Sequence, residues 1–108
     1  MKNASPMYEV ERRAEHAARP GFRITELQIA RNQNVPWHYH SNVQDTFYVI
    51  EGQLRLFLRG PKEDVLLASG DTYSVPPCRP HLVTNAGDAS ATFLVLQGIG
   101  AYDFVPLV

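Results

Sequence analysis

From residue 22 onward the chain is a succession of short apolar runs, and glycine, proline, asparagine or aspartate residues end most of them. Within residues 22–29 apolar and polar side chains alternate, as they do in a strand that is buried on one face. No helical periodicity of about 3.6 residues stands out in this part of the chain. Closely spaced strands that are separated by turns and not by helices predict an all-β sandwich or barrel. They argue against a parallel α/β fold.

The turn residues divide this region into short expected strands. Glu51 and Gly52 form a turn between residues 46–50 and 53–59, which predicts that these two strands pair as a β-hairpin. In the second of them Leu54, Leu56 and Leu58 fall on one face. The strands are expected at residues 22–29, 35–40, 46–50, 53–59, 65–67, 72–75, 81–84 and 91–97.

Residues 9–19 differ from the rest of the chain because they are rich in charged residues and alanine. This composition predicts one or two helical turns or a mobile arm. Pro20 and Gly21 then supply a turn. We therefore expect a short N-terminal arm or strand at residues 1–21 and a barrel at residues 22–108, which together form one domain.

Composition limits the classes of function. The chain has 108 residues, of which 44% are hydrophobic and 19% charged, as is typical of one globular domain. The net charge is −1 and basic residues are scattered, so the sequence predicts no nucleic-acid partner. It contains no apolar run long enough for a membrane span and no secretory signal, and its single cysteine, Cys78, cannot form an internal disulfide. We therefore expect a cytoplasmic protein, without a membrane partner, that binds a small molecule.

Three histidines and one oxygen donor form the most distinctive chemical pattern. His38 and His40 lie two residues apart in a stretch expected to be extended, so their side chains point to the same face. Gln44 and Asp45 follow closely, and His81 comes later. Imidazole suits Zn, Cu, Fe and Ni, and a carboxylate also favours Mn or Fe(II). The pattern predicts a site for one divalent metal ion (Fe, Mn, Zn, Ni or Cu), with positions left open for substrate, water or dioxygen.

These residues resemble the two sequence motifs of the cupin superfamily. The resemblance covers residues 22–97 and implies a jelly-roll barrel, the double-stranded β-helix, with the metal inside it. It also implies that His38, His40, His81 and one oxygen ligand hold the metal. The first motif has its counterpart in Asn32, His38, His40, Asp45 and Gly52, and the second in Gly70, Pro76, Cys78, His81 and Asn85.

The sequence departs from the cupin motifs at three places. Asn32 and Cys78 stand where the motifs have glycine, and the glutamate ligand of the family is missing. Counting back from Gly52 selects Asp45 as the oxygen ligand, whereas the shorter gap after the histidine pair selects Gln44. We favour Asp45 because the count from Gly52 runs along a single strand, and Gln44 is the alternative. Asp45 would offset one metal charge and Gln44 none.

Further residues are candidates for the wall of the site. Tyr73 and Asp103 are candidate catalytic residues. Asp103 lies between aromatic residues after the last strand, where the tail either folds over the barrel mouth or packs at a subunit interface. In the first case burial would raise the pKa of Asp103 and suit it to acid or base catalysis. Arg55 and Arg79 either bind a carboxylate or lie solvated at the surface. The other aromatic candidates are Trp37, Tyr39, Phe47, Tyr48 and Phe57.

The resemblance to metal-binding cupins implies a small-molecule enzyme. Its metal would act as a Lewis acid or activate dioxygen on a chelating keto acid, hydroxy acid, diketone or sugar acid, as in a dioxygenase, isomerase or lyase. One alternative is a ligand-binding or sensor module without turnover. Another is a metal-free enzyme, similar to sugar epimerases, that pairs a histidine with an aspartate. The resemblance also implies a homodimer joined through outer sheet faces, with residues 5–10 as a segment for strand exchange.

Overall fold

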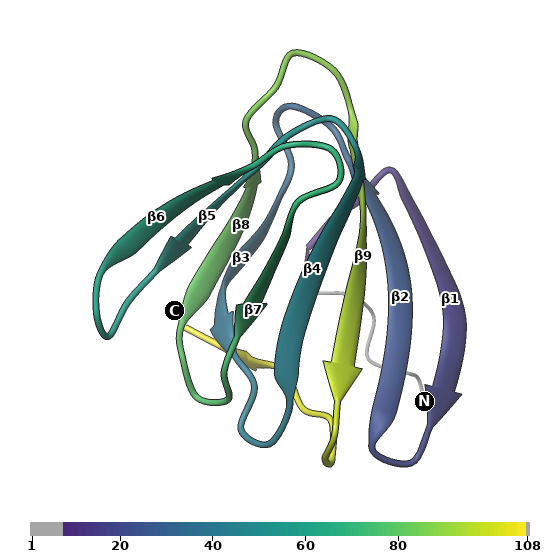
Figure 1. Ribbon diagram of the computed structural model, residues 1–108, viewed down its shortest axis with the longest axis vertical. Helices are drawn as coiled ribbons and strands as arrows, with labels where there is room; N and C mark the ends of the chain where they lie inside the picture. Colours follow the sequence, from purple (N-terminus) through teal and green to yellow (C-terminus); the bar gives the residue numbers. More distant parts are fainter. Residues whose placement is uncertain (1–7, 108) are drawn as a thin grey trace.

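The computed structural model describes residues 8–107, which form two five-stranded antiparallel sheets that face each other (Figure 1). The first sheet has the strand order β1-β2-β9-β4-β7, and the second has the order β10-β3-β8-β5-β6. No helix is present among the described residues, so the predicted all-β jelly-roll barrel is confirmed. The strands are β1 (Arg12–Arg19), β2 (Phe22–Ile29), β3 (Asn34–Tyr39), β4 (Gln44–Glu51), β5 (Leu54–Leu58), β6 (Glu63–Leu67), β7 (Thr72–Val75), β8 (His81–Asn85), β9 (Ala91–Gly98) and β10 (Val105–Pro106).

Alternating apolar side chains from both sheets fill the space between them. Leu54, Leu56 and Leu58 of β5 share one face, as predicted, and are almost fully buried. Phe47 of β4 and Phe93 of β9 pack with their ring centroids 6.1 Å apart. Burying a side chain of this size contributes roughly 1.5–3 kcal/mol. The apolar core therefore holds the two sheets together.

The chain passes from one sheet to the other between β4 and β5. β4 pairs with β7 and β9 in the first sheet, whereas β5 pairs with β6 and β8 in the second. The prediction that residues 46–50 and 53–59 form a hairpin is therefore wrong. Gly52 makes the crossing with a φ of +88°. Turn chemistry specifies a local change of direction, and it does not specify which strand the chain pairs with afterwards.

Residues Arg12–Arg19 form β1, an edge strand of the first sheet, so the predicted helical turns are wrong. β1 pairs with β2 along its length. Glu26 of β2 binds both Arg12 and His16, and Arg23 binds Glu15 at 3.2 Å. Main-chain pairing and these cross-strand charges override the helical preference of alanine and of long charged side chains.

Both ends of the described chain pack against the barrel. Tyr8 and Val10 contact the core, while residues 5–7 of the predicted exchange segment lie outside the described residues. At the other end β10 pairs with β3 and places Pro106 beside His38. Among residues 8–107 no helix has the length and apolarity needed to cross a membrane.

Candidate metal centre

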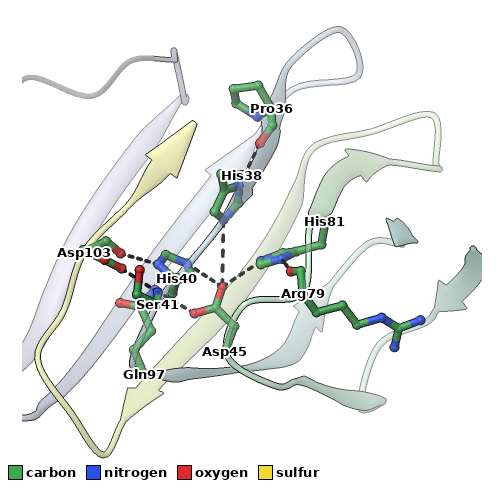
Figure 2. Close-up of polar contacts among 9 residues, drawn as sticks. All are labelled: Pro36, His38, His40, Ser41, Asp45, Arg79, His81, Gln97 and Asp103. Carbon is green, nitrogen blue, oxygen red and sulfur yellow. Dashed lines mark hydrogen bonds and ion pairs between the residues drawn. The ribbon is translucent and has the colours of Figure 1, made fainter. Parts of the chain in front are cut away.

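Three histidines meet on two neighbouring strands of the second sheet. His38 lies on β3 and His40 directly follows that strand, and both side chains point inward, as their spacing predicts. His81 begins β8 and lies opposite His38 in the antiparallel pairing. Asp45, on β4 of the first sheet, faces them across the barrel (Figure 2). The structure therefore brings four sequence-predicted residues together, and none of them is more than 3% exposed.

One carboxylate oxygen is the centre of this group. Asp45 Oδ2 lies 3.0 Å from His40 Nε2, 3.0 Å from His81 Nε2 and 4.0 Å from His38 Nε2. Potential ligand atoms of the four residues all lie within 4.8 Å of one another. Metal-to-ligand distances for nitrogen and oxygen are about 2.0–2.2 Å, so one ion can reach all four side chains.

Main-chain carbonyl groups hold the opposite nitrogen of each imidazole ring (Figure 2). A carbonyl oxygen only accepts hydrogen bonds, so each Nδ1 carries a proton and donates it. Each Nε2 then turns its lone pair toward the centre of the group, which is how second-shell partners orient metal-binding histidines. The three pairs are His38 Nδ1 with Pro36 O (2.7 Å), His81 Nδ1 with Arg79 O (2.9 Å), and His40 Nδ1 with Asp103 O.

Three lone pairs and a carboxylate that face one another repel unless a metal ion or a proton lies between them. Protonating all three rings does not remove the repulsion, because the ring centroids of His38 and His81 are 4.2 Å apart and those of His38 and His40 are 4.9 Å apart. Within the described residues, His40 Nε2 is also a buried nitrogen without a hydrogen-bond partner. One divalent ion would satisfy all four groups at once, so this donor set fits the predicted metal.

Burial and mutual contacts shift the pKa values of this group. Burial, reinforced by the nearby His81, lowers the pKa of His38 to about 3. Burial acts in the same direction on His40, but its contact with Asp45 outweighs burial and raises its pKa. For Asp45 burial acts to raise the pKa, yet the contacts with His40 and His81 hold that pKa well below its ordinary value. The group thus presents an ionised carboxylate and a neutral His38 ring, as metal ligation requires, whereas the contact with Asp45 favours the protonated form of His40, from which a bound metal would displace the proton.

Gln97 holds the carboxylate of Asp45 from the other side. It lies opposite Asp45 in the pairing of β9 with β4, and its Nε2 donates to Asp45 Oδ1 at 2.8 Å. Sequence reasoning missed Gln97, although a polar residue at an inward position of an otherwise apolar strand is a usable signal.

Gln44, the alternative oxygen ligand, has an exposed side chain that donates to Thr46 Oγ1 and lies outside the group.

A cavity of about 40 Å³ adjoins the group inside the barrel. His38, His40 and Asp45 form part of its wall, and Phe47 is the member of the predicted aromatic set that lines it. Much of the remaining wall is apolar, with Phe93 and Val95 of β9 among its residues, and Arg13 and Arg23 add positive charge. The metal group therefore lies beside a small, partly cationic chamber.

The C-terminal segment forms part of the wall of this chamber. The ring of Phe104 stacks on His38 with a centroid distance of 4.3 Å and an interplanar angle of 16°. The ring of Tyr102 lies 5.5 Å from that of His40, and the guanidinium of Arg23 lies 4.0 Å from the Tyr102 ring centroid. The tail folds over the barrel of its own chain, which is the first of the two predicted arrangements, and packing at a subunit interface stays a prediction.

Asp103 belongs to this segment, but it does not line the cavity. Its carboxylate accepts a hydrogen bond from the main-chain nitrogen of Ser41 at 2.8 Å. Hydrogen bonding to Ser41 lowers the pKa of Asp103, so the prediction of a raised pKa is wrong. The physical reason is that the carboxylate gains a donor without losing its contact with solvent.

Three other predicted side chains lie outside the cavity wall. The hydroxyl of Tyr73 donates to Glu63 at 2.9 Å, and Arg79 donates to the same carboxylate at 2.9 Å. Arg55 forms a two-pronged ion pair with Asp64 at 2.9 and 2.6 Å. These side chains stabilise the barrel surface around β5, β6 and β7, and the catalytic role of Tyr73 stays a prediction.

Cys78, at the glycine position of the second motif, is exposed. It has a φ of +69°, so the turn keeps the left-handed conformation that glycine adopts more easily. Its main-chain nitrogen donates to the carbonyl oxygen of His40 at 2.7 Å. The residue therefore contributes to the site through its backbone, which ties the turn before β8 to the end of β3.

Several solved structures share this fold. They include oxalate oxidase (TM-score 0.74, 18% identity, 81% of this chain and 46% of that chain) and the formate complex of Lactobacillus farciminis oxalate decarboxylase (TM-score 0.73, 18% identity, 81% and 27%). Bacillus subtilis oxalate decarboxylase, whose Mn(II) centres have been characterised, matches with a TM-score of 0.73 and 24% identity over 81% of this chain and 24% of that chain. The chain thus spans about half the length of the oxidase and about a quarter of the decarboxylases.

Sequence comparison agrees with the structural likeness. Among curated proteins, none matches the sequence closely enough to be counted as a relative. The family model of the Cupin domain, however, matches residues 25–97, which is more than half of the chain. That span contains both histidine motifs and all four members of the metal group. The chain therefore belongs to the cupin family.

Proposed function

We propose that this chain is a metal-dependent enzyme that acts on a small oxygenated acid. The observation that carries the proposal is the convergence of three imidazole nitrogens and one carboxylate oxygen on a single point beside a cavity inside the barrel. A bound divalent ion would supply Lewis acidity toward chelating substrate oxygens and, as Fe(II), redox chemistry with dioxygen.

The charge of the cavity supports an acidic substrate. Arg13 and Arg23 line it, whereas Asp45 is the one acidic residue among its described lining residues, and that carboxylate faces the histidines. Arg23 is held by its ion pair with Glu15 at 3.2 Å and by the ring of Tyr102. A guanidinium fixed in this way can orient a substrate carboxylate with its remaining N–H donors.

The size of the cavity supports a substrate of few atoms. A volume of about 40 Å³ holds only a few water molecules. Phe104 covers His38 and keeps bulk water from the imidazole rings. The related structures agree in scale, since one oxalate oxidase structure is a complex with glycolate and one oxalate decarboxylase structure is a formate complex.

Elemental analysis of protein purified without added metal tests the metal requirement. We expect about one equivalent of divalent metal in the wild type and its loss in His81→Ala and Asp45→Ala. Gln44→Ala is the matched control beside Asp45 and should keep its metal. Wild-type protein that contains no metal, and takes up none on titration, would contradict the proposal. Loss in Gln44→Ala alone would identify Gln44 as the oxygen ligand.

Turnover is tested separately on metal-loaded protein. The protein is incubated with oxalate, glycolate and other small 2-oxo and 2-hydroxy acids, with and without dioxygen, and the loss of each acid is followed. We expect one of these acids to be consumed by the wild type and not by His81→Ala. An acid that binds to the loaded protein and is never consumed would instead support a ligand-binding module.

One contact favours a second candidate function. His81 Nε2 and Asp45 Oδ2 lie 3.0 Å apart, so without a metal a proton on Nε2 would be shared between them, and such a pair can serve acid–base catalysis in a metal-free enzyme similar to sugar epimerases. That candidate predicts activity that survives chelator treatment. A metal-dependent enzyme loses its activity to the chelator and regains it when the ion is restored.

A further inference from the structure

The three histidines of the metal group obtain their Nδ1 partners in different ways. His38 and His81 each donate to the carbonyl of the residue two positions earlier, so short local segments fix these two rings. His40 donates to the carbonyl of Asp103, which lies 63 residues later in the sequence. The orientation of His40 therefore depends on the C-terminal segment being docked on the barrel.

Asp103 contacts this part of the barrel through both its backbone and its side chain (Figure 2). Its carbonyl accepts from His40 Nδ1, and its carboxylate accepts from the main-chain nitrogen of the next residue, Ser41, at 2.8 Å. Asn42 then donates to the carbonyl of Ala101 at 3.2 Å. Residues 40–42 are thus bound by residues 101–103, and Asp103 makes two of the three contacts.

The docked segment also fits closely against Gly21, in the turn between β1 and β2, and against Asn42. Gly100 donates its main-chain N–H to Gly21 O at 3.0 Å. A Cβ atom at Gly100 would collide with the main chain of Asn42, whose carbonyl carbon would be only 3.2 Å away. A side chain at position 100 would therefore displace the segment that carries Asp103.

We propose that Asp103 is a positioning residue of the metal centre and acts through His40; this inference rests on the proposed metal-binding function. The carboxylate anchors the segment on Ser41, which puts the Asp103 carbonyl where it keeps the proton of His40 on Nδ1. Nε2 of His40 then faces the metal position with its lone pair. Without the anchor the His40 ring is free to turn and to exchange tautomers, so this ligand is presented for only part of the time.

Binding of Mn(II) to the full-length chain, followed by the EPR signal of the free ion, tests this proposal. We expect Asp103→Ala to weaken Mn(II) binding about ten- to a hundredfold, the usual effect of losing a second-shell partner. Asp103→Asn keeps an oxygen acceptor for Ser41 but cannot act as an acid or base, and should bind Mn(II) as the wild type does. Gly100→Ala, which leaves Asp103 in place and displaces the segment, should weaken binding as Asp103→Ala does.

Asp71→Ala is the matched control. The Asp71 carboxylate also accepts a main-chain hydrogen bond, from Ala68 at 2.9 Å, in a turn that does not line the cavity. Thermal unfolding of the metal-free variants should register the loss of either anchor, whereas only Asp103→Ala should weaken Mn(II) binding. This comparison separates a role in positioning His40 from a general loss of stability.

Different binding results overturn the role of Asp103 and the metal-dependent function. If Asp103→Ala and Gly100→Ala bind Mn(II) as tightly as the wild type, the inference is overturned and the metal-dependent function stands. An Asp103→Asn variant as weak as Asp103→Ala also overturns the inference, because the charge and not the acceptor would then matter. Wild-type protein that binds no Mn(II), Fe(II) or Zn(II) overturns both.

Discussion

At the scale of single residues, Asp45 is bound on both of its oxygens. Oδ2 faces the three histidines, and Oδ1 accepts a hydrogen bond from Gln97 at 2.8 Å. Asp45 is one methylene shorter than the glutamate of the family motif, so its carboxylate has less freedom to adjust. Gln97 fixes the orientation in which one oxygen, and not both, is available to the metal.

We therefore predict that Gln97→Leu weakens metal binding. The substitution keeps much of the side-chain volume but leaves Oδ1 of Asp45 without its buried donor, and the carboxylate can then rotate away from the histidines. The expected loss in affinity is about ten- to a hundredfold, measured by competition for Zn(II) with a chromophoric chelator. Thr25→Val removes the hydroxyl of another buried polar residue that lines the same cavity and is the control. Equal metal affinities for the wild type and Gln97→Leu would show that Gln97 does not orient Asp45 for metal binding.

The members of the metal group could be predicted from a local rule together with the resemblance to the cupin motifs. His38 and His40 share a face through the two-residue period of a strand, whereas Asp45 and His81 were selected by their positions in the two motifs. The partners that orient them could not be predicted in the same way. Gln97 lies 52 residues from Asp45, and the carbonyl that binds His40 lies 63 residues away. Contacts over such separations depend on strand order, which the motif spacing does not contain.

At the scale of elements, strands with an alternating buried face were predicted well and β1, which has none, was not. β2, with alternating burial, has the predicted bounds of residues 22–29. β1 has no residue that is fully buried, so its sequence carries no two-residue apolar pattern. Its strand conformation comes from pairing with β2 and from ion pairs such as those of Glu26. Neither the pairing nor the ion pairs can be read from the composition of residues 12–19. That composition by itself favours a helix.

The crossing between β4 and β5 gives a prediction about stability. Gly52 and Gly70 both have positive φ, +88° and +91°. At Gly52 an added Cβ would lie 2.8 Å from the carbonyl oxygen of Ser90 and 2.9 Å from Ala91 Cα, whereas at Gly70 nothing lies within 4 Å. Gly70→Ala should therefore cost only the left-handed backbone strain, about 1–2 kcal/mol. Gly52→Ala adds a collision of the new Cβ with backbone atoms of Ser90 and Ala91 and should cost clearly more.

Urea unfolding of the two glycine variants measures this difference, with unchanged slopes indicating that the unfolded states are comparable. Because the conformational strain is nearly the same at both positions, the difference between the variants isolates the close packing of Gly52 against the loop before β9. Equal destabilisation would mean that the crossing can shift to make room, and that Gly52 is needed only for its backbone conformation.

At the scale of the whole molecule, the outer faces of the two sheets differ. On the second sheet guanidinium groups cover half-buried aromatic rings, with Arg59 4.0 Å from Trp37 and Arg55 5.1 Å from Phe57. The first sheet has outward apolar side chains on adjacent strands instead. Tyr48 and Ile50 of β4 are 38% and 42% exposed. The half-buried outward residues beside them are Ile24, Leu94 and Leu96.

We propose that this apolar face pairs two copies of the chain, because contiguous apolar surface on a small domain is commonly an interaction site. Light scattering should give about twice the 12.1 kDa mass of one chain. Leu94→Glu, in the middle of the face, should shift the mass to that of a monomer, since a carboxylate would be desolvated at the interface.

Leu66→Glu, at a 63% exposed position of the second sheet, should remain dimeric. All four members of the metal group come from one chain, so monomeric Leu94→Glu should still bind metal. A wild-type chain that stays monomeric at high concentration would rule this interface out.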